Sequence, residues 1–221
     1  MSVEINVRGQ HAVTLPPERA TIHAALTLEG PQPEPVFQAV AAAVAEIVAS
    51  IEALHHPKKG PVTWYAFDQV RLGARRPWHK DGKQLPLVHS AAVSIAVTFR
   101  DFDELARWVS WSAGVDGLSI SYVDWALTET KRLKVERATR QKAVRDAQRR
   151  AQDYADALDL GKVVVRGISD PGVGRPAPMA RAMLAAESMP VDGGAAEFAL
   201  RPEDVEIAAG VEAVFTVASR N

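Results

Sequence analysis

The 221-residue sequence contains no cysteine. This absence excludes disulfide bonds, thiolate metal sites and cysteine nucleophiles. The histidines are few and scattered, and they show neither HxxxH nor HxH spacing: His11, His23, His55, His56, His79 and His89. The carboxylates are scattered as well, so spacing nominates no acid–base pair. We therefore predict no enzymatic activity, no cofactor and no metal, and only a site assembled from distant residues is left open.

The sequence also lacks a long uninterrupted apolar run. The first eight residues carry Glu4 and Arg8, where a signal peptide requires an apolar stretch. The most apolar segment, residues 39–51, is interrupted by Glu46 and Ser50 and is too short to cross a bilayer. We expect no membrane span and a cytoplasmic location.

Charge is unevenly distributed, although the net charge is only −1. Residues 131–150 hold nine lysines and arginines against two carboxylates, a charge of +7 that leaves −8 for the remainder. A basic helix on an acidic body favours an anionic partner, such as an acidic protein, or packing between copies of the chain. The candidate contact residues are Lys142, Arg145 and Arg149.

Periodicity predicts interleaved strands and helices. Strands are expected near residues 3–9, 21–28, 62–72, 89–99, 118–125, 162–168 and 205–217, and helices near 34–54, 102–113 and 129–160. The class is therefore α+β with α/β-like interleaving, antiparallel pairing and a long basic helix. We expect a single unit over residues 1–221, or two subdomains of about 1–100 and 101–221.

The long helix separates packing from charge. An apolar stripe of mostly small residues is predicted to face a sheet: Ala143, Ala147, Ala151, Tyr154 and Leu158. Lys142, Arg145 and Arg149 then lie on the solvent side.

The tract over residues 169–199 is rich in proline and glycine and holds every methionine except the first. Loop-length statistics favour a flexible excursion. The alternative is an adaptable contact strip, because methionine repacks easily, with Met179 and Met183 as its contacts. Gly172 to Ala177 imitate a dinucleotide fingerprint, but Pro176 and Pro178 disfavour the helix that such a site requires.

Aromatic and basic residues alternate after residue 63. Arg75, Arg76 and Trp78 follow Trp64 and Tyr65 in a pattern that is able to stack bases and hold phosphates. No RNP, KH or helix-turn-helix signature accompanies them, so an exposed hairpin tip with solubilising charges is favoured. Nucleic acid is thus disfavoured as a partner but left open.

Residues at both ends of the chain resemble the SIMPL-domain family. The resemblance rests on Ile5-Asn6-Val7-Arg8-Gly9, on Ala20-Thr21-Ile22, on the alanines of the long helix with Leu158-Asp159-Leu160-Gly161, and on residues 211–217. It implies ββα units with a flat antiparallel sheet, a tendency to self-associate and no established enzymatic activity. Some relatives are associated with oxidative-stress defence or signalling complexes. Many relatives are exported, and Arg201-Pro202-Glu203-Asp204 replaces their usual Pro-Gly turn.

Three functional hypotheses follow. The first is a non-enzymatic, self-associating scaffold or stress-related interaction protein, with a homo-oligomer as the expected state. The second is a polyanion binder acting through the basic helix at residues 131–150 and the hairpin at 71–83. The third is an enzyme with a distributed, unrecognised site.

Overall fold

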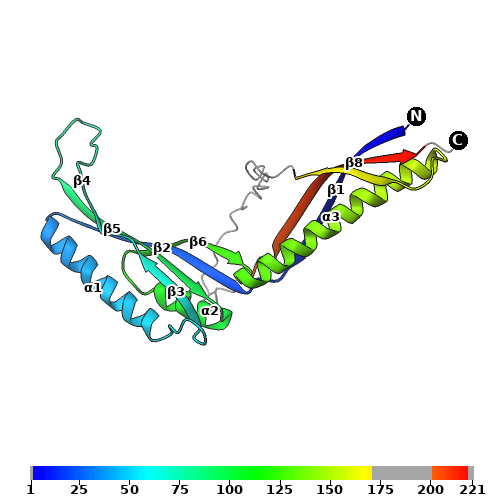
Figure 1. Ribbon diagram of the computed structural model, residues 1–221. Helices are drawn as coiled ribbons and strands as arrows, with labels where there is room; N and C mark the ends of the chain where they lie inside the picture. Colours follow the sequence, from blue (N-terminus) through cyan, green and yellow to red (C-terminus); the bar gives the residue numbers. More distant parts are fainter. Residues whose placement is uncertain (1, 171–200, 219–221) are drawn as a thin grey trace, which may run out of the picture. The chain divides into compact units, whose positions relative to one another are not determined.

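The computed structural model describes residues 2–170 and 201–218, and these divide into two compact units (Figure 1). Of the described residues, the inserted unit comprises 16–127 with 201–203, and the terminal unit comprises 2–15, 128–170 and 204–218. The boundaries lie at Leu15 and Leu127, and not near residue 100, because the last strand returns to pair with the first. The fold is α+β, with three helices and two antiparallel sheets in the described residues.

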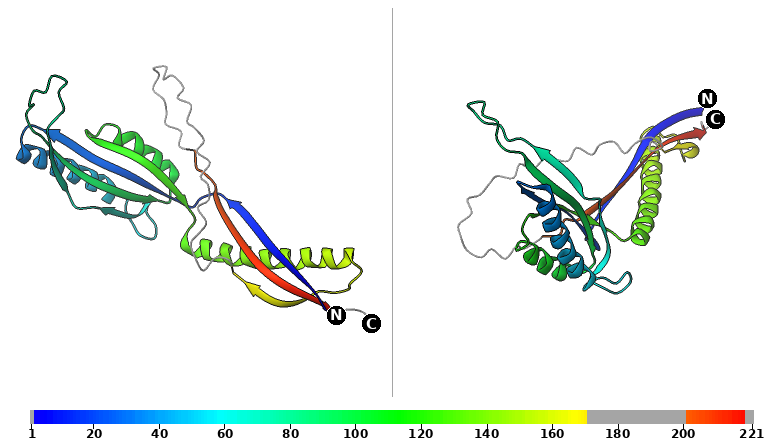
Figure 2. Two further views of the ribbon diagram at one scale, coloured as in Figure 1. Left: turned by 90° about the horizontal axis from the view of Figure 1, so that it is seen from above. Right: turned by 90° about the vertical axis from the view of Figure 1, so that its left-hand side faces the viewer.

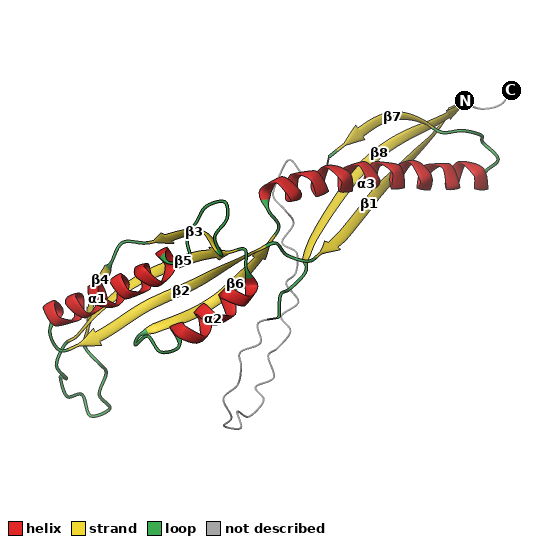
Figure 3. Cartoon of the chain, turned by 90° about the horizontal axis from the view of Figure 1, so that it is seen from below, coloured by secondary structure: helices red, strands yellow, loops and turns green. Residues whose placement is uncertain are grey.

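The inserted unit is a five-stranded sheet covered by two helices. Its elements are β2 (Arg19–Gly30), α1 (Pro33–Glu52), β3 (Val62–Phe67), β4 (Arg71–Arg75), β5 (Val88–Phe99), α2 (Phe102–Ser112) and β6 (Leu118–Ala126). The strand order is β3-β5-β2-β6, and β4 pairs with the part of β5 that β3 leaves free. Both helices lie on the same face of this sheet (Figure 3), so no helix of the described residues covers the opposite face, which we call the uncovered face.

Strict alternation in β2 and β5 builds the core of the inserted unit. Ile22, Leu26, Val97 and their same-face neighbours are buried, while the intervening residues point to the other face. Helix α2 begins at Asp101, whose carboxylate accepts hydrogen bonds from the backbone of Asp103 and Glu104. Trp108 lies in this core and donates its indole hydrogen to Ser50 at 3.1 Å.

Helix α1 is long and apolar enough to cross a membrane by length and composition, with a mean hydropathy of 1.5. In this fold it buries Val36, Val40, Ile47 and Ile51 against the sheet. Core helices of globular proteins have the same composition, so the absence of a membrane span stays a prediction, as does the location.

The terminal unit consists of β1 (Ser2–Leu15), α3 (Glu129–Ala157), β7 (Val164–Ser169) and β8 (Val205–Ala218). Its sheet has the order β1-β8-β7, and β1 and β8 pair without interruption from Ser2↔Ala218 to Leu15↔Val205. Helix α3 runs along β1 and β8 on one face (Figure 2).

An alanine row joins α3 to its sheet. Ala143, Ala147, Ala151 and Ala155 are at most 1 % exposed. The prediction that Tyr154 and Leu158 complete this row is wrong, because they are 59 % and 63 % exposed. Ala155 instead continues the i, i+4 steps, which keep one line along the helix facing the strands.

Candidate functional site

The uncovered face of the five-stranded sheet holds a shallow trough of about 430 Å³. Its floor is made of small residues, including Ala25, Ser94 and Ala96, because these positions alternate with the buried ones on β2 and β5. Trp64, with 52 % of its area exposed, and Tyr122, with 54 %, line it from β3 and β6. The trough is therefore open and flanked by aromatic rings.

A stacked and ion-paired group fixes one wall of the trough. The imidazole of His23 lies against the ring of Tyr122, with ring centroids 4.4 Å apart and planes at 15°. The His23 Nε2 atom is 3.2 Å from the carboxylate of Asp124. The pairing of β2 with β6 brings these residues together, with a bulge after His23. Each lies on the solvent side of its strand, a position that the sequence pattern indicates, but their partners are about a hundred residues away.

The trough also holds the Ser94 hydroxyl on β5. The Ser94 hydroxyl accepts a hydrogen bond of 2.6 Å from Arg71. No hydroxyl in the described part of the chain is hydrogen-bonded to His23. Within residues 2–170 and 201–218, no group of three His, Asp or Glu residues is arranged to hold a metal ion.

Helix α3 neutralises part of its own charge. Arg132 pairs with Glu129 and Glu136, while Arg149 and Arg150 lie at 4.0 and 3.0 Å from Asp146. The side chains predicted to face solvent, Lys142, Arg145 and Arg149, are all exposed. No carboxylate of the described residues lies within 4.0 Å of Lys134, Arg137, Lys142 or Arg145. A smaller basic surface than the sequence predicts thus remains on α3.

Residues 70–88, which we call the arm, comprise β4, a turn and the start of β5. Arg75 forms an ion pair of 2.9 Å with Glu29, and Arg76 donates a hydrogen bond of 2.8 Å to the Leu85 carbonyl. These two candidate contact residues therefore hold the arm in shape. Trp78 is 84 % exposed. Met179 and Met183, with the tract from 171 to 199, lie outside the described residues.

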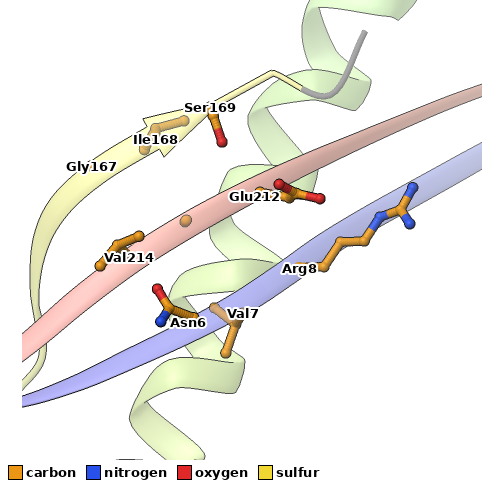
Figure 4. Close-up of a pocket in the computed structure, with 9 residues that line it drawn as sticks. Asn6, Val7, Arg8, Gly167, Ile168, Ser169, Glu212 and Val214 are labelled. Carbon is orange, nitrogen blue, oxygen red and sulfur yellow. The ribbon is translucent and has the colours of Figure 1, made fainter.

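Strand β7 forms an edge of the terminal sheet and exposes apolar side chains. Val164, Val165 and Ile168 are 62 %, 53 % and 55 % exposed, because α3 packs on β1 and β8 rather than on β7. Beside them lies a concavity of about 510 Å³ (Figure 4), lined in part by Asn6, Arg8, Gly167, Ser169 and Glu212. Figure 4 places α3 behind this part of the sheet, so the concavity is on the uncovered face.

Two sheets, each covered by helix on one face, define an α+β protein with large uncovered sheet surfaces. A family model described as a SIMPL protein of unknown function (DUF541) matches residues 5–215. The chain therefore belongs to the SIMPL family, as its residues predict. Comparison with curated proteins finds no match.

Proposed function

We propose that this SIMPL protein is a non-enzymatic, self-associating interaction module, in which β7 is the contact between copies. The observation that carries the proposal is the exposure of Val164, Val165 and Ile168 on a strand that pairs on one side only within the described residues. An exposed apolar edge strand offers both unpaired backbone groups and apolar area to a second chain. A scaffold or stress-related role belongs to the same proposal.

The single charge on β7 is placed where it does not oppose association. Arg166 is the only charged residue in the strand, and it is paired with Glu4 on β1 across the sheet. Charged side chains at an edge normally prevent strand addition, and this arginine is held over the sheet rather than free at the edge. The charge of Arg166 therefore does not protect this edge, and the protection that β7 has is its length of six residues and a register shift between Val165 and Gly167.

Sedimentation at micromolar concentrations tests the proposal with the variant Val165→Lys. A lysine at the apolar edge is expected to raise the dissociation constant more than tenfold, because its charge must be desolvated in the contact. Val70→Lys makes the same change on a residue that is 40 % exposed in the inserted unit and is expected to associate as the original chain does. A strict monomer, or unchanged association of Val165→Lys, would contradict the proposal.

Polyanion binding through α3 is a second candidate, supported by the unpaired Lys134, Arg137, Lys142 and Arg145. Filter binding to DNA and RNA at about 50 and 200 mM salt measures it, because each phosphate contact contributes about −0.9 to the slope of log affinity against log salt. The double change Lys142→Gln and Arg145→Gln is expected to reduce that slope by about 2. Affinity that does not change with salt would exclude this candidate.

A further inference from the structure

The arm has a defined conformation although its own residues bury little area. All five residues of β4 are exposed, and the strand is held by its pairing with β5, by the Arg75–Glu29 ion pair and by the hydrogen bond from Arg71 to Ser94. Figure 1 shows the arm extending away from the helix-covered part of the sheet. An element that buries so little adds little to the stability of the unit, so its order serves another purpose.

The tip of the arm is a built turn. The Gly82 amide donates to the His79 carbonyl at 3.0 Å, and the Asp81 amide donates to His79 Nδ1 at 3.2 Å. Gly82 has a φ of 69°, a conformation that favours glycine. With the hydrogen bond from Arg76 to Leu85, these contacts hold Trp78 at the end of the arm.

The side chains of the arm combine exposed apolar groups with positive charge. Trp78 is the most exposed large apolar residue in the described part of the chain, at 84 %, and Leu72, Leu87 and Val70 are 66 %, 43 % and 40 % exposed. The arm carries five cationic residues and one carboxylate, that of Asp81: Arg71, Arg75, Arg76, Lys80 and Lys83. Exposed apolar side chains within a basic segment indicate contact with an anionic partner that also has an apolar layer.

The composition selects among anionic partners. Pro77 and Pro86 flank the tip and lack amide hydrogens, so the tip does not extend a partner's sheet by strand addition. Nucleic acid is bound by several exposed planar side chains, whereas at the tip Trp78 is the one largely exposed aromatic ring and the His79 imidazole, 30 % exposed, lies 3.8 Å from the Asp81 carboxylate. Tryptophan prefers the headgroup level of a bilayer, and lysine and arginine extend from there to anionic lipids.

We infer that the arm binds the surface of an anionic lipid bilayer, with Trp78 at the headgroup level and Lys80 and Lys83 on the lipid phosphates. The contact is interfacial and does not cross the membrane, because the tip has too few apolar residues to span it. It is independent of the proposed self-association, since β7 belongs to the other unit.

Vesicle co-sedimentation of the full chain tests this inference, with phosphatidylcholine alone and with a phosphatidylcholine–phosphatidylglycerol mixture. Binding is expected only to the anionic mixture. The double change Lys80→Gln and Lys83→Gln is expected to weaken it more than tenfold, because each cation near an anionic surface contributes about a fivefold factor. Trp78→Ala is expected to weaken binding and to remove the blue shift of tryptophan fluorescence on vesicle addition.

Trp64→Ala is the matched control, because Trp64 is also exposed and lies on the uncovered sheet face away from the arm. It is expected to bind vesicles as the original chain does. The inference would be overturned if the Trp78 and lysine variants bound vesicles as strongly as the original chain, or if the original chain did not bind the anionic vesicles. DNA binding that these variants abolish, without vesicle binding, would assign the arm to nucleic acid instead.

Discussion

Asp146 is the residue that connects the basic helix to the first strand. Its carboxylate accepts a 3.0 Å hydrogen bond from the backbone amide of Gln10, 136 residues away, and another from Arg150. The Gln10 hydrogen bond first, and Arg150 with Arg149 after it, lower the pKa of Asp146 below its usual value. The charged form therefore stabilises the contact between α3 and β1.

Asp146→Asn is expected to lower the free energy of unfolding by about 1 kcal/mol at neutral pH, because it weakens the hydrogen bonds that the carboxylate accepts. The loss is no larger because 20 % of the side chain is exposed, and solvent screens its charge. A carboxyl with a lowered pKa in the folded protein stabilises above its unfolded pKa and loses this effect as pH falls through the folded one. The difference between the two proteins should therefore shrink below about pH 4. Denaturant unfolding at neutral and acidic pH measures it.

Asp153→Asn removes an exposed carboxylate from the same helix and is expected to change stability by less than about 0.5 kcal/mol. A stability difference for Asp146→Asn that persists unchanged in acid would show that the carboxylate charge is not its source.

Single residues were predictable where the pattern is local. The spacing of Ala143, Ala147 and Ala151 indicates their burial, and all three are buried. Tyr154 and Leu158 were assigned wrongly, because the buried line follows i, i+4 steps from Ala151 to Ala155, and Leu158 lies beyond the last helical residue, Ala157. Asp146 and His23 carry no local signal, since their partners are set by pairing between distant elements.

At the scale of elements, the approach of α3 to β1 depends on Gly9. A β-carbon at this position would lie 2.1 Å from the Ala143 carbonyl oxygen and 2.5 Å from the Ala147 amide nitrogen. Both are backbone atoms, so the helix itself must move to accept a side chain. Gly9→Ala is therefore expected to destabilise the terminal unit by about 3 kcal/mol, measured by denaturant unfolding.

Gly210→Ala is the matched control on the neighbouring strand. Its added β-carbon would meet no atom closer than 3.6 Å, so stability should stay within about 0.5 kcal/mol of the original. Equal effects of the two changes would mean that close packing against α3 is not what requires glycine at position 9.

Gly9 and the helix alanines also explain the family resemblance in physical terms. The strand motif ending at Gly9 and the small residues of α3 form one interface. The family motifs, although far apart in the sequence, therefore belong to a single contact between strand and helix. Other elements were less predictable. Residues 62–72 read as one strand but form β3 and β4, because two strands share the length of β5 and the chain bends between them.

At the scale of the whole molecule, one unit is inserted in the other. The chain forms β1, then the complete five-stranded sheet with its helices, and only then α3, β7 and β8. A sequence pattern shows each element but not which distant strands pair to close a unit. This is why two subdomains were expected to meet near residue 100, whereas the second boundary lies at Leu127.

The insertion predicts that the two units fold with different requirements. Residues 16–127 contain the whole of their own core, including Ile22, Phe99 and Trp108, so this segment alone is expected to unfold cooperatively and to keep the near-ultraviolet circular dichroism of buried Trp108. The terminal unit needs both ends of the chain. Removing residues 1–15 takes away β1, and with it the buried Ile5 and Gly9, against which α3 packs.

Deletion of residues 1–15 is therefore expected to abolish the unfolding transition of the terminal unit while leaving that of the inserted unit in place. Calorimetry of the full chain, the deletion and the 16–127 segment separates the two transitions. Loss of both transitions on deletion, or a 16–127 segment without cooperative unfolding, would show that the inserted unit requires the terminal one. If the transition of the inserted unit is retained, β1 is needed only by the terminal unit.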